Sequence, residues 1–255
     1  MKAMDVVYVI GRGSKWQNNE LRYSLRSICR YGIGLGKVII VGDELPEFVN
    51  EDKVTYLECN DQPGDSPARN VYRKIAHVFA RTDLDAFLLS SDDHFFIKPT
   101  YFDLYPLYYK GARMPSGSEK GIGDKRYTQT MADTGRYMEE LGLDMRFFEG
   151  HTNKLYMRVA WSLMSDSIER WMSGTEYGIS TNAPMQACIL KVFPMFPCQY
   201  RKDIKLEHLN TPEDRKQLKD ANSFSIYDSA INSGVAEYLA GLFPSPCRFE
   251  KTACW

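Results

Sequence analysis

The first 97 residues alternate buried-strand patterns with amphipathic helix patterns, and this alternation restricts the fold more than any other feature of the chain. Residues 5–10, 37–43, 54–58 and 87–91 are apolar and rich in β-branched or aromatic side chains, as expected of strands buried on both faces. Residues 18–31 and 69–81 instead carry apolar side chains at helical spacing. Strands that alternate with helices predict right-handed βαβ units and a parallel sheet.

The pattern beyond Pro99 is less regular and more helical. Helices are expected over residues 130–141, 159–171, 182–192, 213–220 and 226–242, and residues 114–124 are expected to form a loop. We therefore predict an α/β fold with a mostly parallel sheet flanked by helices and a more helical C-terminal part. We expect residues 1–255 to form a single domain.

Composition and charge restrict the function. The chain has 44% hydrophobic residues and a net charge of −1, so it should have a substantial core and no global attraction to nucleic acid or an anionic membrane. It shows no signal-peptide pattern and no apolar window long enough to span a bilayer. We expect a soluble cytoplasmic protein with reduced cysteines, no membrane association and no obligate protein partner.

Several polar segments follow the predicted strands directly. Ligands of parallel sheets bind at the carboxyl ends of the strands. This rule places residues 11–14, 42–43, 61–69 and 92–93 around one crevice. The convergence of four segments favours a binding site more than any one motif does.

Asp92 and Asp93 stand at the end of the apolar strand 87–91 and are followed by His94. Carboxylates at the end of a buried strand are costly unless they meet a cation, hydrogen bonds or solvent. Their oxygens suit Mg²⁺ or Mn²⁺, with positions left for the phosphates of a substrate. The alternative is a simple strand-end turn with a solvated His94.

Several strings of the sequence point to a known family. They are residues 7–11, the string Asn-Glu-Leu-Arg-Tyr-Ser-Leu-Arg-Ser-Ile at 19–28, residues 38–43 and 87–93, Gly150-His151, and the tail 242–250. Together they resemble Stealth-type sugar transferases of capsule synthesis and small GT-A-fold glycosyltransferases of bacteria and phages. The resemblance implies a Rossmann-like, nucleotide-sugar-binding half in residues 1–97 and an acceptor-side half in residues 98–255.

The resemblance also implies a metal site. Ser91-Asp92-Asp93-His94 would represent the Asp-x-Asp element of GT-A enzymes, with Ser91 in place of its first carboxylate. Which of Asp92 and Asp93 binds Mn²⁺ or Mg²⁺ directly stays open. His208 is the candidate for a late histidine ligand, and imidazole is compatible with Mn²⁺.

Donor-binding residues follow from the same resemblance. They are expected at the strand ends, where Gly11, Arg12 and Ser14 would contact the nucleotide and Asp43 would approach the base or ribose. Basic residues that would neutralise the diphosphate are Arg69, Lys74 and Lys202. The alternative for residues 11–14 is an ordinary turn, and Arg22 and Arg26 either brace the site or solvate a helix face.

Residues on the acceptor side are less determined. An inverting enzyme needs a general base; His151 is the leading candidate and Asp133 the second. A retaining enzyme needs no such base, so stereochemistry stays open.

The implied function is metal-dependent transfer of a hexose from a nucleotide sugar, most simply a UDP-hexose, to a hydroxyl acceptor. The acceptor is either a glycan or a hydroxymethylated pyrimidine of phage DNA, and a phage protein would act in the host cytoplasm. For DNA, the basic segments 120–126 and 201–205 and the aromatic segment 101–109 would contact phosphates and a displaced base. The alternatives are a Stealth-like sugar-1-phosphate transferase and a noncatalytic carbohydrate- or nucleotide-binding module.

Overall fold

A computed structural model of the chain describes residues 3–115, 125–209, 211–232 and 234–251. Part of the expected loop 114–124, part of the basic segment 120–126, and Cys254 lie outside these residues.

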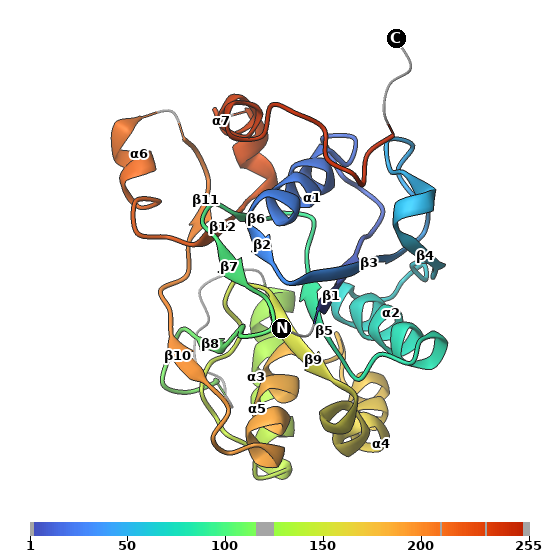
Figure 1. The fold of residues 1–255 in the computed structure, drawn as a ribbon. Coiled ribbons are helices and arrows are strands. Elements are labelled where there is room, and N and C mark those ends of the chain that lie inside the picture. The colour runs from blue at the N-terminus through green and yellow to red at the C-terminus, as the bar shows by residue number, and fades with distance from the viewer. Residues whose placement is uncertain (1–2, 116–124, 210, 233, 252–255) are drawn as a thin grey trace.

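The centre of the molecule is a sheet with the strand order β4-β3-β1-β5-β9 (Figure 1). The strands are β1 (Met4–Val9), β3 (Leu35–Gly42), β4 (Thr55–Glu58), β5 (Ala86–Ser90) and β9 (Lys154–Met157). The first four pair in parallel, and β9 pairs antiparallel with β5. This arrangement confirms the prediction of a mixed α/β fold with a mostly parallel sheet. Strand β9 was not expected from the sequence.

Helices cover both faces of this sheet. Helix α1 (Asn19–Tyr31) lies on one side, whereas α2 (Pro67–Arg81), α4 (Arg158–Gly174) and α5 (Asn182–Val192) lie on the other (Figure 1). Ser66 caps α2 by accepting a hydrogen bond from the Arg69 amide, and Pro67 occupies the first turn. Trp161 of α4 stacks on Phe79 of α2, as expected for core tryptophans.

The C-terminal half adds smaller elements around the central sheet. Helix α3 is Lys125–Glu140, and the three-stranded sheet β11-β12-β6 consists of β11 (Lys205–Leu206), β12 (Ser223–Ile226) and β6 (His94–Phe96). The remaining elements are β2 (Gly32–Ile33), η1 (Glu51–Lys53), β7 (Thr100–Tyr101), β8 (Leu107–Tyr109), β10 (Cys198–Tyr200), α6 (Pro212–Lys216), η2 (Asp228–Asn232) and α7 (Val235–Leu242).

The predicted last helix, residues 226–242, is wrong in its first half. Ile226 ends strand β12, a short 3-10 helix follows, and α7 begins only after Gly234. Gly234 has a φ of +79°, a left-handed conformation that ends one segment before the next begins. The predicted helix 213–220 is likewise shorter and ends at Lys216.

The buried apolar residues form two clusters. The main cluster surrounds the central sheet and joins residues such as Val7, Leu88 and Tyr156. The second lies between the β11-β12-β6 sheet and α7 and includes Phe224 and Leu239. Among the described residues no helix is long and apolar enough to cross a membrane, and the described cysteines form no disulfide.

The C-terminal segment is fastened to α1 by a buried ion pair. Arg26 donates from Nε and Nη2 to the two carboxylate oxygens of Glu250, both at 2.7 Å, and from Nη1 to the Phe243 carbonyl. The side chains of Arg26 and Glu250 are only 11% and 5% exposed. Arg26 therefore braces the fold from within and does not solvate a helix face.

Replacing Arg26 by leucine should destabilise the protein by about 3 kcal/mol, because the buried Glu250 carboxylate would lose its bidentate partner and keep only the longer contact with Arg22 Nε, at 3.7 Å. Urea unfolding followed by circular dichroism measures this loss. Arg81→Leu, at an exposed end of α2, is the matched control and should change stability by about 0.5 kcal/mol or less. Equal stabilities of the two variants would contradict the bracing role.

Candidate functional site

The strand order of the central sheet reverses direction between β1 and β5. From β1 the chain moves outward through β3 and β4, and α2 then returns it to β5 on the other side of β1. Open α/β sheets bind ligands outside the carboxyl ends of the strands at such a reversal. The structure has a cleft of about 330 Å³ there. Its lining comes from the ends of β1, α1, β5 and β12, and includes Gly11, Arg12, Gly13, Ser14, Glu20, Ser91, Asp92, Asp93 and Asp228.

Acidic side chains dominate one wall of this cleft. β5 ends at Ser90 and β6 begins at His94, so Asp92 and Asp93 occupy the tight turn between two strands. Burial, followed by the negative charges of Asp93 and Glu20, raises the pKa of Asp92 to about 7. A bound cation would relieve this penalty, and carboxylate oxygens are the ligands that Mg²⁺ and Mn²⁺ prefer.

Asp93 also faces positively charged or protonatable groups. Its Oδ2 lies 3.8 Å from Lys205 Nζ, and its Oδ1 lies 3.7 Å from His94 Nε2. His94 is 8% exposed, burial lowers its pKa to about 4, and its Nδ1 has no hydrogen-bond partner among the described residues. The alternative of a solvated His94 is therefore wrong.

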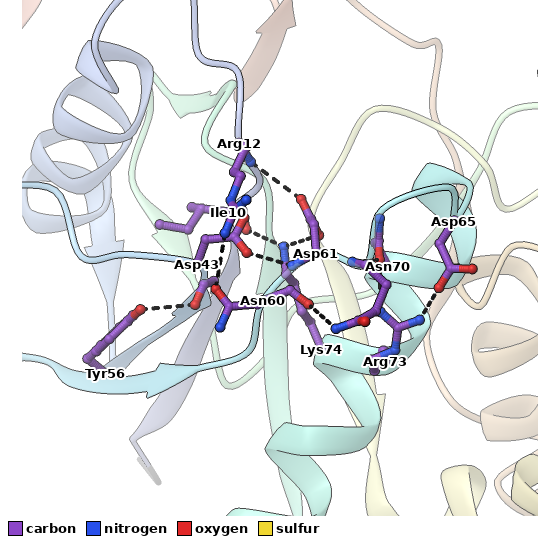
Figure 2. Close-up of polar contacts among 12 residues, drawn as sticks. Ile10, Arg12, Asp43, Tyr56, Asn60, Asp61, Asp65, Asn70, Arg73 and Lys74 are labelled. Carbon is purple, nitrogen blue, oxygen red and sulfur yellow. Dashed lines mark hydrogen bonds and ion pairs between the residues drawn. The ribbon is translucent and has the colours of Figure 1, made fainter.

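A network of charged side chains joins the neighbouring strand ends (Figure 2). Lys74 of α2 is 2% exposed and donates to the Ile10 carbonyl at 2.7 Å and to Asp61 Oδ1 at 2.6 Å. Asp43 accepts a hydrogen bond from the Asp61 amide at 2.5 Å and pairs with Arg12 Nε at 3.2 Å. Lys74 and Asp43 thus fix the geometry of the rim, whereas the Arg12 side chain remains 69% exposed.

Gly11 and Ser14 shape the turn that follows β1. A Cβ on Gly11 would lie 3.3 Å from Asp61 Oδ2, so a larger residue would crowd the network. Ser14 Oγ donates to Glu20 at 2.8 Å and accepts from the amides of Trp16 and Asn18. The turn therefore holds the Glu20 carboxylate in the cleft.

Three other residues that were predicted for the donor and metal sites do not line this cleft. Arg69 donates to the carbonyls of Met172 and Thr175 at the end of α4, at 2.8 and 2.5 Å. His208 is 57% exposed and lies 3.4 Å from Asp214 of α6, while Lys202 is exposed on the connection between β10 and β11. In the described parts of the chain no group of three or more His, Cys, Asp or Glu side chains is arranged to hold a metal ion.

The two candidate bases have different surroundings. Asp133 is buried in α3, where Gln129 and Arg136 of the same helix bond to it. His151 is about one-third exposed, and Asp203 accepts from its backbone amide at 2.7 Å and contacts its Nδ1 at 2.6 Å. When the imidazole is neutral and Nδ1 donates to Asp203, Nε2 is left as the proton acceptor.

Asp203 stays ionised in this arrangement. Burial by itself would raise its pKa, but the hydrogen bonds and charge of His151 and the Lys110 ammonium at 3.3 Å outweigh burial and hold the pKa well below its usual range. Asp203 was not predicted. Its only signal in the sequence is its position inside the basic segment 201–205.

Lys154 is a further residue that sequence reasoning missed. It is 3% exposed, pairs across from Leu89 of β5, and donates to Thr152 Oγ1 at 3.0 Å. Burial lowers its pKa to about 8. The sequence before Lys154 shows no regular alternation of helix and strand patterns. It therefore did not predict that residues 154–157 form a strand that pairs with β5.

A search against protein-family models finds no match for the chain, and a search of curated proteins finds none either. The functional assignment therefore depends on the geometry of this rim and on the resemblance of the sequence strings.

Proposed function

We propose that the chain is a metal-dependent GT-A-type glycosyltransferase that moves a hexose from a nucleotide sugar, most simply a UDP-hexose, to a hydroxyl acceptor. The observation that supports it best is the pair Asp92 and Asp93 beside buried Glu20, in a cleft at the point where the strand order reverses. Nucleotide ligands bind at such positions in α/β sheets.

Asp92 and Asp93 would hold the cation, and the residues present suit it. Their oxygens are hard ligands, and burial, followed by the negative charges of Asp93 and Glu20, raises the pKa of Asp92, a penalty that a cation would relieve. A bound Mn²⁺ or Mg²⁺ would supply neutralisation of the departing diphosphate. Lys205, 3.8 Å from Asp93, would add a second positive charge there.

The reaction breaks the bond between the anomeric carbon and the diphosphate oxygen and forms a bond from that carbon to the acceptor oxygen. In an inverting reaction His151 Nε2 takes the proton of the acceptor hydroxyl, and the nucleoside diphosphate leaves with the bonding electron pair. Asp203 holds the imidazole in the required tautomer through Nδ1. A retaining reaction would proceed without this base.

Incubation of the full chain with UDP-glucose and Mn²⁺ should release UDP as the hexose passes to water in place of the acceptor, and EDTA should abolish the release. Asp93→Asn keeps the shape of the side chain but removes its charge, so UDP release should fall by about 100-fold or more. Asp166→Asn, an exposed carboxylate of α4, is the control and should match the wild type. Release of UMP would indicate sugar-1-phosphate transfer, and release of no nucleotide with any divalent metal would refute the proposal.

His151→Ala should lower transfer to the acceptor by about 100-fold or more, the usual contribution of a positioned base, while UDP affinity measured by calorimetry stays near wild type. Asp203→Asn should also lower transfer to the acceptor, but by a smaller factor. Glycans and oligonucleotides containing hydroxymethylcytosine are each tested as the acceptor, and a mass gain of one hexose identifies the product. Full transfer activity in His151→Ala would exclude the base role and favour a retaining reaction.

A further inference from the structure

A second cavity of about 350 Å³ lies where the first turns of α2, α3 and α5 meet. We propose that this cavity binds a neutral pyranose ring and is the acceptor pocket of the glycosyltransferase proposed above, on which this inference rests. The acceptor would then be a glycan.

The walls of the cavity have two chemical characters. Val71, Met131 and Tyr127 provide apolar and aromatic surface, and Tyr127 is 44% exposed. Glu149 and Asn182 of the same lining provide hydrogen-bonding groups. A pyranose ring has the same division, with C–H groups that pack on aromatic faces and hydroxyl groups at its edge. Cavities of this volume and mixed lining are typical of small-ligand sites.

The polar wall is held in place before any ligand arrives. Glu149 Oε1 accepts from Ser180 Oγ at 2.5 Å and from the Ala183 amide at 2.8 Å, so the carboxylate caps the N-terminus of α5. Asn182 Nδ2 lies 3.5 Å from Glu149 Oε2. Hydroxyl groups of a sugar would meet oriented acceptors and donors, which lowers the entropy cost of binding.

One residue of the cavity lining, Glu149, is close in sequence to the candidate base. Glu149 stands two residues before His151, and the chain between them is a single glycine. Tyr127 and Glu149 both line the cavity, and burial, followed by the negative charges of Glu149 and Asp203, raises the pKa of Tyr127 to about 12. A sugar that contacts Glu149 in the cavity would therefore lie next to the segment that carries His151.

The charge of the lining favours a neutral ligand. Its charged residues are Arg126 and Glu149, which have opposite signs. A DNA acceptor would need an excess of lysine and arginine around the pocket to neutralise the phosphates on both sides of the target base. A glycan needs no such excess.

The proposal is tested by titrating the full chain with methyl glucoside, methyl galactoside or methyl mannoside. Binding is measured from changes in the NMR chemical shifts. At least one glycoside should bind the wild type, and Tyr127→Ala should weaken it by about tenfold or more because the stacking surface is lost. Tyr127→Phe keeps the ring and should retain most of the affinity. Tyr200→Ala, an exposed tyrosine outside the cavity, is the control and should bind as the wild type does.

Failure of the pocket and failure of the proposed function are distinguishable, because UDP release from UDP-glucose is measured separately on the same proteins. Glycoside binding without UDP release would support a carbohydrate-binding site and would refute the proposed transferase activity. UDP release without glycoside binding, or glycoside binding that Tyr127→Ala leaves unchanged, would refute the pocket. Binding of a hydroxymethylcytosine oligonucleotide that Tyr127→Ala abolishes would overturn the choice of a glycan.

Discussion

The buried ammonium of Lys74 is the contact on which the rim of the sheet depends. An ammonium that is 2% exposed is costly unless it is paired and hydrogen-bonded, and here Asp61 and the Ile10 carbonyl supply both. Through the Asp61 amide the same contact reaches Asp43. The ends of β1 and β3 and the loop after β4 are thereby held together, and the cleft beside β1 has a fixed wall. A nucleotide at this wall would meet exposed Arg12 directly, while Lys74 and Asp43 act behind it.

Charge is separated across the rim. Glu20, Asp92 and Asp93 make one side acidic, whereas Lys110, Lys154 and Lys205 lie beyond the turn at β5 with His151 among them. On each side, burial and neighbouring charges of the same sign make the charged form costly. Burial and then Asp93 and Glu20 raise the pKa of Asp92, whereas burial, together with Lys110 and Arg201, lowers the pKa of Lys154. A metal-bound diphosphate carries both signs, so it would satisfy both sides at once.

The rim could be predicted from the sequence to the extent that it is built from local patterns. Alternating strands and helices place Gly11, Asp43 and Asp92 at the carboxyl ends of parallel strands, and the structure has them there. Lys154 and Asp203 could not be found, because antiparallel pairing of β9 with β5 and the contact of residue 203 with His151 join segments far apart in the chain. His208 and Arg69 are residues of the right chemical type, but their neighbours Asp214 and the end of α4 hold them.

The contact between His151 and Asp203 couples the two halves of the proposed reaction. Asp203 lies between β10 and β11, and Lys205, two residues later, reaches Asp93. His151 lies just after Glu149, whose carboxylate is fixed to α5. One short segment, residues 203–205, therefore contacts both the acidic turn that would hold the cation and the histidine that would take the proton. In the proposed reaction, this segment would help to fix the position of the donor relative to the acceptor, because parallel pairing of β11 with the buried strand β12 holds Lys205 in place.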